Sequence, residues 1–221
     1  MLHHAGRRLD EEQRFLGHRV AEFGDVPMNP IDIGESLSLI TAHYAGFHAA
    51  GTRPLTAGGD HLITLPILRA LAKDGPVGLI QFDAHSDTND SYFGGHKYTH
   101  GTWVRRAIEE GLIDPKRCVE IGIRGTRYAP DGNDFAENAG VTTLYIEDVY
   151  RLGIEGTIAE ARRIAGSGPT YLTFDVDGID PAYTPGTGTP EVGGYTVFEA
   201  QQMVRGLKGL NLIGADVVEV S

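Results

Sequence analysis

A short apolar run followed by three oxygen- or nitrogen-donor side chains most constrains how this chain can fold. The run Val77–Phe82 follows Gly75-Pro76, and its length and aliphatic content are typical of a fully buried strand in a parallel sheet. Asp83, His85 and Asp87 come directly after it at alternate positions, so they share one face of an extended segment. Open α/β sheets bind ligands at the carboxyl ends of their strands, and the sequence therefore predicts a site there.

Two carboxylates and an imidazole at one strand end need a cationic partner. Like charges about 4 Å apart repel by roughly 4 kcal/mol at an effective dielectric of 20, which makes a divalent metal a favourable partner. This segment alone leaves a second interpretation open, in which Asp83 caps a turn, His85 lies at the core edge and Asp87 is solvated. The rest of the sequence has to decide between the two.

Apolar runs and helical patterns alternate along the chain. Apolar residues recur at helical spacing over 31–50, and Gly51 follows as a stop signal. Further helices are predicted at residues 62–73, 100–111, 154–164 and 197–208, and strands at 53–57, 77–82, 119–123, 141–146, 171–174 and 212–220. Residues 124–138 are polar, with no predicted element. The alternation predicts an α/β fold with three α/β/α layers around a mostly parallel sheet.

Composition limits the classes of fold and ligand. The 221 residues are 41% hydrophobic with no break in composition, which predicts a single domain over residues 1–221. The formal net charge of −11 argues against nucleic acid as a ligand. We expect a cytoplasmic protein, because we find no apolar signal region at the amino terminus and no run of membrane-spanning length. The single cysteine, Cys118, excludes an intramolecular disulfide and is expected in the core.

Two more predicted strand ends carry potential metal ligands. Gly58-Gly59 gives a tight strand-to-helix turn before His61, and the strand 171–174 is followed by Asp175 and Asp177. With the first segment this makes six potential ligands, four of them carboxylates that would balance two divalent cations. Oxygen-rich sites with two imidazoles suit manganese best, with iron, cobalt, nickel or zinc possible, and the lack of thiolates argues against structural zinc.

From about Asp25 to Ser221 the sequence resembles the ureohydrolase family, the arginases and agmatinases. The motifs that carry the resemblance are Gly58-Gly-Asp-His61, Asp83-Ala-His-Ser-Asp87, His100-Gly-Thr102, Asp175-Val-Asp-Gly-Ile-Asp-Pro181 and Gly186-Thr-Gly-Thr-Pro190. Within the family, the segment 90–95 and the run 100–111 most resemble the agmatinase and guanidinoalkanoate-hydrolase branch. The resemblance implies an arginase/deacetylase-like fold and two manganese ions per chain.

The resemblance also implies roles for individual residues. Six side chains would hold the metals: His61 and Asp87 on one ion, His85 and Asp177 on the other, and Asp83 and Asp175 bridging both. Asp87, His100 and Glu219 are the expected catalytic residues. His100 matches the family's proton-shuttle histidine, and its rival His96 lacks the following Gly-Thr. Glu219 matches the acidic residue that pairs with the guanidinium, and its alternative is a surface residue at a strand end.

The function implied is hydrolysis of the guanidino group of agmatine, or of a related small molecule, to urea and an amine. Asn89 occupies a position that arginases use towards the substrate α-carboxylate, so a guanidino acid such as 4-guanidinobutanoate stays open. The resemblance further implies a role in polyamine metabolism and a homo-oligomer, a trimer or a hexamer, with neither nucleic acid nor membrane as partner.

Family chains usually carry further elements at both ends, so this chain is expected to lack some of them. That leaves an inactive, truncated metal-binding fragment as an alternative function. A deacetylase relative that uses one zinc is disfavoured, because His61 and Asp87 would then have no metal to bind.

Overall fold

The main feature of the computed structural model is one parallel sheet of six strands in the order β3-β8-β7-β4-β5-β6. The model describes residues 14–15, 18–127 and 134–221. The strands are β3 (Leu55–Ala57), β4 (Val77–Phe82), β5 (Ile113–Ile123), β6 (Thr142–Tyr145), β7 (Thr170–Asp175) and β8 (Leu212–Val218). Every neighbouring pair in this sheet is parallel. A separate antiparallel pair, β1 (Arg14–Phe15) and β2 (His18–Arg19), precedes it.

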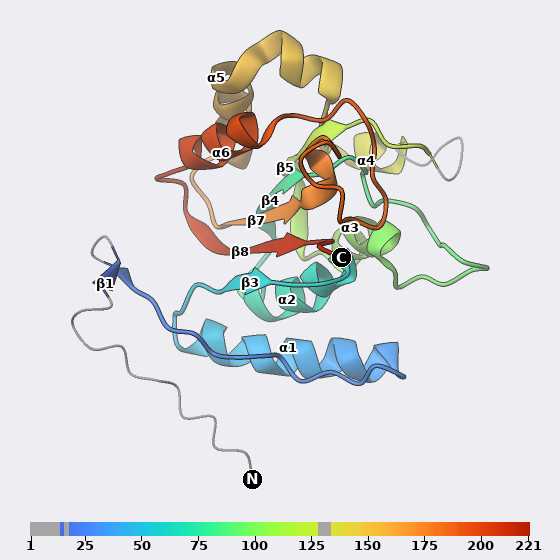
Figure 1. Cartoon of the computed structure of the whole chain (residues 1–221). Helices are drawn as coiled ribbons and strands as arrows, with labels where there is room; N and C mark the ends of the chain where they lie inside the picture. Colours follow the sequence, from blue (N-terminus) through green and yellow to red (C-terminus); the bar gives the residue numbers. More distant parts are fainter. Residues whose placement is uncertain (1–13, 16–17, 128–133) are drawn as a thin grey trace.

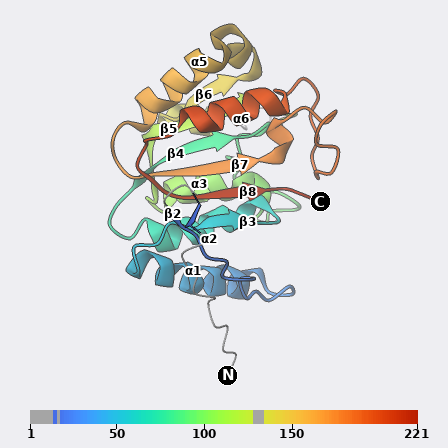
Figure 2. The same cartoon turned by 60° about the vertical axis from the view of Figure 1, so that its left-hand side comes forward.

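Helices cover both faces of the sheet, which confirms the predicted three-layer α/β fold (Figure 1). The helices are α1 (Ile33–Ala49), α2 (Thr64–Leu71), α3 (Trp103–Glu109), α4 (Asp134–Ala139), α5 (Ile146–Ala165) and α6 (Val197–Gly206). Figure 2 shows α1 and α2 on one side of the sheet and α5 and α6 on the other. Within the described residues, none of the helices is sufficiently long and apolar to cross a membrane.

Successive side chains of β4 pack alternately against the two helical layers. Leu79 packs into a core cluster with Leu68 of α2 and Trp103 of α3. Its neighbour Ile80 packs into a second cluster with Ile164 of α5. Successive strand residues face opposite sides, so a strand between two helical layers must be apolar throughout. All six residues of β4 are accordingly buried, with the bounds that the sequence predicted.

The site lies where the strand order reverses. From β4 the chain continues outward to β5 and β6, then returns to place β7 on the other side of β4 and β8 beyond it. Loops leaving β4 and β7 therefore diverge and leave a crevice at the carboxyl edge, the usual ligand position in such sheets. Figure 1 shows the carboxyl ends of β3, β7 and β8 at a common edge, close to the chain's carboxyl terminus.

Several predicted boundaries differ from the structure. Strand β5 begins at Ile113 rather than Val119, and its register with β4 shifts between Val77 and Leu79. Helix α5 begins at Ile146 rather than Ile154 and contains a kink at Gly153, where φ is 66°. Glycine adopts positive φ without a Cβ penalty, so it permits the chain to turn between the two helical parts. The α4 helix lies in the segment predicted to be irregular, part of which, 128–133, is outside the described residues.

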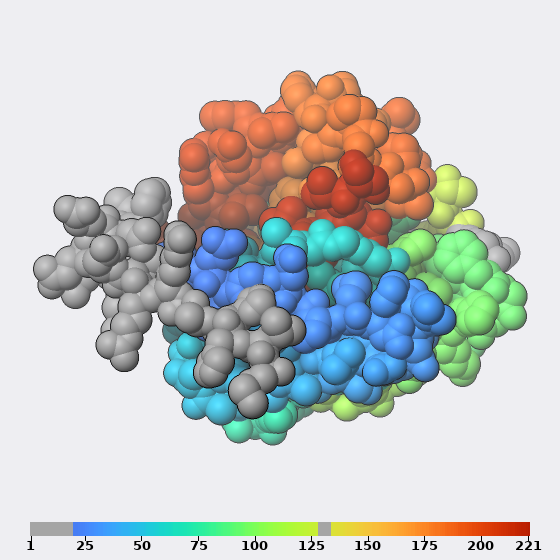
Figure 3. Space-filling model, turned by 60° about the horizontal axis from the view of Figure 1, so that its bottom comes forward, coloured from blue at the N-terminus to red at the C-terminus, as the bar shows by residue number. Residues whose placement is uncertain are grey.

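One face of the sheet edge formed by β3 and β8 is exposed. Leu55 of β3 is 78% exposed, and Val217 of β8 is 38% exposed. Figure 3 shows the neighbouring surface, where α1 and the segment before it lie across the front, and the carboxyl-terminal segment reaches the surface beside β3. The helical cover therefore ends before this edge on the α5 and α6 side.

Candidate metal centre and active site

His61 lies at the centre of three buried carboxylates. Its Nδ1 atom is 3.0 Å from Asp87 Oδ2, 3.1 Å from Asp175 Oδ2 and 3.2 Å from Asp83 Oδ2. The residue opens the short helix η2 (His61–Ile63), and the carboxylates follow β4 or end β7. Buried polar atoms normally have a hydrogen-bond partner, yet Nδ1 has none among the described residues. An imidazole nitrogen facing three carboxylate oxygens is the arrangement expected around a cation.

The other ring nitrogen of His61, Nε2, forms a hydrogen bond with Thr173. Nε2 lies 2.8 Å from Thr173 Oγ1, and Thr173 donates its hydroxyl proton to Asp216 Oδ1 at 2.5 Å. Because that hydroxyl is already donating, its oxygen accepts the Nε2–H of His61, and Nδ1 keeps a lone pair for a metal. Neither Thr173 nor Asp216 belongs to a motif that the sequence shows. The available signal was the acidic Asp216 within an apolar strand.

His85 forms a second group with Asp177 and Asp83. His85 Nδ1 is 2.9 Å from Asp177 Oδ2 and 3.6 Å from Asp83 Oδ1. Two sets of potential ligand atoms result, His61/Asp83/Asp175 and Asp83/His85/Asp177, each within 4.8 Å. Asp83 belongs to both sets, as expected for a carboxylate shared by two metals. The structure thus brings together all six residues that the sequence placed in the metal centre.

Backbone geometry directs Asp87 inward. Its φ is 54°, one of three positive values among non-glycine residues in the described chain. Aspartate tolerates this left-handed region better than most residues. The turn carries its Oδ2 towards His61, and the buried indole Nε1 of Trp103 donates to the same oxygen at 2.8 Å.

Burial and mutual repulsion alter the acidity of the carboxylates. Burial, with the charge of Asp83 added, raises the pKa of Asp175 to about 9 and that of Asp87 to about 6. Burial also opposes ionisation of Asp83, but the nearby His61 and His85 side chains outweigh it and hold the pKa of Asp83 well below its usual range. For His85, burial favours the neutral ring, but Asp177 and Asp83 raise its pKa to about 12. The raised pKa values of Asp175 and Asp87 disfavour ionisation of the whole carboxylate set, and bound divalent cations would favour it.

We expect two divalent ions per chain, bound more tightly at high pH than at low pH. Metal ligands must be deprotonated, so each proton displaced from Asp175 or His85, whose pKa values are raised to about 9 and about 12, strengthens apparent binding by about tenfold per pH unit below those values. Calorimetric titration with manganese at about pH 6 and about pH 8, in buffers of different ionisation enthalpy, measures affinity and proton release together. A stoichiometry that stays near one, or an affinity independent of pH, would contradict this centre.

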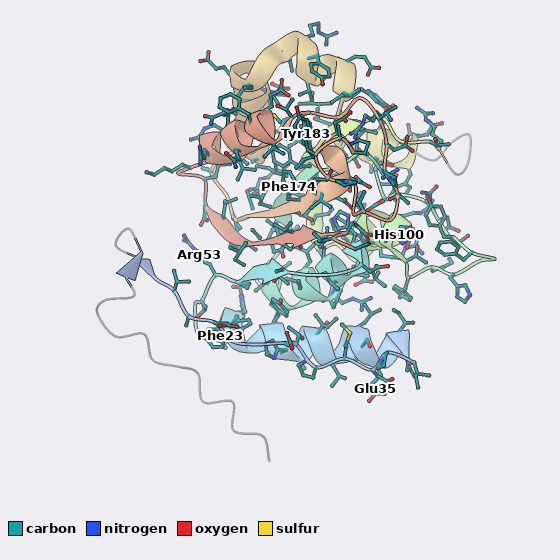
Figure 4. All side chains as sticks on the ribbon, viewed as in Figure 1. Phe23, Glu35, Arg53, His100, Phe174 and Tyr183 are labelled. Atoms are coloured by element: carbon teal, nitrogen blue, oxygen red, sulfur yellow. The ribbon has the colours of Figure 1, made fainter. Side chains whose placement is uncertain are left out.

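A cavity of about 230 Å³ opens above the metal ligands. It is lined by His85, Asp87, Tyr92, His100, Thr126, Asp175, Asp177, Thr189, Pro190, Glu191 and Glu219. His100 begins the short helix η3 (His100–Thr102), and Figure 4 shows it at the edge where β3 and β8 end. His96, the rival proton shuttle, is exposed and is not among the lining residues.

Asp60 controls the charge of His100. Asp60 Oδ2 lies 3.5 Å from His100 Nδ1 and raises the pKa of His100 through a hydrogen bond and its charge. A histidine with a raised pKa stays protonated closer to neutral pH, which suits a proton donor. Tyr92 and Phe93 hold the ring from its sides, with ring centroids 5.7 and 5.8 Å from that of His100.

Glu219 lies after β8 rather than on the strand, which corrects the predicted strand bounds. The strand ends at Val218, and Glu219 has a φ of 61°. Its backbone N–H donates to Gly59 O, and its Oε1 accepts the His61 backbone N–H at 2.7 Å. Burial raises the pKa of Glu219. The left-handed turn thus aims the carboxylate into the cavity from the end of the sheet.

The structure separates Asn89 from this cavity. Both its backbone N–H and its side-chain Nδ2 donate to Gly101 O, at 3.1 and 3.2 Å. Asn89 instead lines a small adjoining cavity together with Arg127, and Asp87 and Tyr92 line both. Its predicted contact with a substrate carboxylate stays a prediction.

Several known proteins are similar to this chain in sequence and in fold. Residues 1–221 match the sequence model of the arginase family. The guanidinopropionase of Pseudomonas aeruginosa is 61% identical over 92% of this chain and 64% of its own length, and the guanidinobutyrase of the same organism is 48% identical over 91% and 63%. The crystallised proclavaminate amidino hydrolase of Streptomyces clavuligerus superposes with a TM-score of 0.85 at 39% identity, over 90% of this chain and 66% of that one.

Coverage of the relatives is partial, but coverage of this chain is nearly complete. The chain spans slightly less than two thirds of the length of the two Pseudomonas enzymes. In the other direction, the match extends over the metal ligands, His100 and Glu219, since the family model covers all 221 residues. This protein chain belongs to the arginase family.

Proposed function

We propose that this chain hydrolyses the guanidino group of a small molecule to urea and an amine. The observation that supports this most is the pair Glu219 and His100, which line one cavity next to the six candidate metal ligands. A carboxylate offers two oxygens to the planar N–H groups of a guanidinium, and a histidine can supply a proton at the reacting nitrogen. Glu191 and Glu219, which line the cavity but lie outside the candidate ligand set, leave negative charge there that attracts a cationic head group.

Each group has one task in the proposed reaction. The six candidate ligands would hold divalent ions, manganese by the chemistry of the donor set, and such ions would lower the pKa of water so that hydroxide is available near neutral pH. Glu219 accepts N–H bonds from the guanidinium and orients its central carbon, to which the water oxygen adds. The bond from that carbon to the alkyl nitrogen then breaks. His100 gives its proton to this nitrogen, and Asp87, which also lines the cavity, takes the proton of the added hydroxyl, so urea and a neutral amine leave. Asp60 favours the protonated form of His100 that this step requires.

For the substrate we infer a short guanidino acid. Relatives named guanidinopropionase and guanidinobutyrase are 61% and 48% identical, and the human protein named guanidino acid hydrolase is 46% identical. The adjoining cavity contains Arg127, a cation suited to a substrate carboxylate. Agmatine, with a cationic tail, is the second candidate, because the chicken mitochondrial agmatinase is 47% identical. We further propose that the chain assembles into a homo-oligomer and is located in the cytoplasm.

Urea release from a panel of substrates tests this function. With manganese bound, 3-guanidinopropanoate or 4-guanidinobutanoate should be turned over faster than agmatine, arginine and guanidine. If agmatine is the best substrate, the guanidino-acid proposal fails while the hydrolase remains. If metal binds but no substrate yields urea, the chain is an inactive metal-binding protein.

Arg127→Met should raise KM for guanidino acids by about tenfold, about 1.4 kcal/mol, and leave KM for agmatine unchanged or lower. The reason is that only the acids present a carboxylate to this side chain. Steady-state urea assays on both substrates provide the measurement, and Arg163→Met, on the exposed surface of α5, is the matched control. An equal rise in KM for guanidino acids and for agmatine would show that Arg127 does not bind the substrate carboxylate.

A further inference from the structure

One polar residue from each of the six strands lies in a single row across the sheet. Neighbouring strands pair these residues directly, in the order Thr56, Asp216, Thr173, Gln81, Glu120 and Thr143. Paired residues in a parallel sheet point to the same face, here the one covered by α2 and α3, since Leu79 and Cys118 point there too. The interior members Asp216, Thr173, Gln81 and Glu120 are fully buried.

Gln81 connects this row to the candidate metal centre. Its Nε2 donates to Asp83 Oδ2 at 2.8 Å and to the backbone oxygen of His85 at 3.2 Å. These two acceptors fix the amide orientation, because the reverse orientation would place Oε1 against the Asp83 carboxylate. Gln81 Oε1 consequently points away from Asp83 and requires a donor. Among the described residues it has none.

Glu120, which pairs with Gln81 on the neighbouring strand β5, also has one side-chain oxygen without a hydrogen-bond partner. Its Oε2 accepts a hydrogen bond from Thr143 Oγ1 at 2.9 Å, whereas its Oε1 has no partner within the described part of the chain. Side chains paired across neighbouring strands lie about 5 Å apart at Cβ, which is within reach for Glu and Gln. The two directly paired residues thus each have one oxygen that lacks a donor among the described residues, and one shared proton would satisfy both.

The surroundings of Glu120 favour its acid form. The charged groups that act on it, Asp83, Asp87 and Glu137, are all acidic. Complete burial, reinforced by these negative charges, raises the pKa of Glu120 well above its ordinary value. A buried carboxylate without a cation is strongly disfavoured, so the group stays protonated and gains an O–H donor.

We propose that Glu120 is a neutral acid that donates to Gln81 Oε1, and that it thereby positions Gln81 Nε2 on the shared carboxylate Asp83. Glu120 is then a positioning residue that acts two side chains away from the metals. This inference rests on the proposed function only in treating Asp83 as a metal ligand. Its consequence is that an amide at position 120 should serve as well as the acid, whereas an apolar side chain should not.

Two matched variants test the donor role by metal affinity, without substrate. Glu120→Gln keeps an acceptor for Thr143 and an N–H donor for Gln81, so manganese affinity should stay within about threefold of the parent. Glu120→Met has similar length but no donor, and affinity should fall by about 10- to 100-fold, as is typical when support for a ligand is removed. Gln81→Leu should cause a similar loss, and the double variant Gln81→Leu/Glu120→Met no further loss. Equal losses in the Gln and Met variants would overturn the proposal.

Infrared difference spectroscopy tests the proton itself. The spectrum of the parent minus that of Glu120→Gln, at neutral pH, should show the C=O stretch of a protonated carboxylic acid, both with and without manganese. Carboxylate bands in its place would overturn the proposal even if Glu120→Met failed to fold. Because neither readout involves turnover, a chain that releases no urea would refute the proposed function and leave this inference to be decided by these two results.

Discussion

His100→Asn is expected to slow urea release by about 10²- to 10⁴-fold and to leave both metal sites filled. His100 lines the cavity beside the metal ligands but belongs to neither of the two ligand sets that include Asp83. Asn fills similar space and cannot supply a proton to the leaving amine. Single-turnover urea assays at saturating substrate, with parallel metal analysis, measure the effect.

Two controls make the His100 prediction specific. Asp60→Asn removes the group that raises the pKa of His100, so the loss of activity at rising pH should begin at lower pH than in the parent. His48→Asn, on α1 and remote from the cavity, should be close to neutral. If His100→Asn turned over at the parent rate, the proton donor would have to be reassigned, and His96 would be the first candidate despite its exposure.

Glu219→Gln is expected to lower kcat/KM by roughly 30- to 5,000-fold, which corresponds to about 2–5 kcal/mol for a charge pair broken in a desolvated site. Gln keeps the size of the side chain and can still accept the His61 backbone N–H, so the metal site should stay intact. The loss should appear with every guanidino substrate, because all present the same head group. Only the charge that faces the guanidinium is removed.

Steady-state urea release by parent and variant at matched manganese occupancy provides this measurement. The control Glu160→Gln, on the outer surface of α5, changes the same chemical group far from the cavity and should have little effect. A ratio within about threefold between Glu219→Gln and the parent would mean that Glu219 does not anchor the guanidinium.

The sequence by itself determined the central strand and the six side chains of the candidate metal centre. Val77–Phe82 was recognisable because a strand covered on both faces must be apolar throughout. The alternate spacing of Asp83, His85 and Asp87 follows from the two-residue period of extended chain, which is a local property. The alternation of strands and helices, which predicted the parallel sheet, is likewise visible in the local periodicity of apolar residues.

Other boundaries required the tertiary structure. The early start of β5 depends on a register shift against β4, and the extension of α5 back to Ile146 depends on how Gly153 joins its two parts. Glu219 was predicted within the last strand but lies just after it. The strand ends at Val218 because a left-handed turn follows, in which the Glu219 backbone N–H donates to Gly59 O. None of these features has a periodic signature in the sequence.

Only the tertiary structure shows which polar side chains lie next to the candidate metal ligands. Thr173, Asp216, Gln81 and Glu120 come from four strands and are far apart in sequence. They form one row only because strand order and register bring them together. Sequence periodicity specifies which face of its own strand a side chain occupies, but the partner across the sheet depends on long-range pairing. The candidate ligands could therefore be proposed from the sequence residue by residue, whereas the row of polar side chains next to them could not.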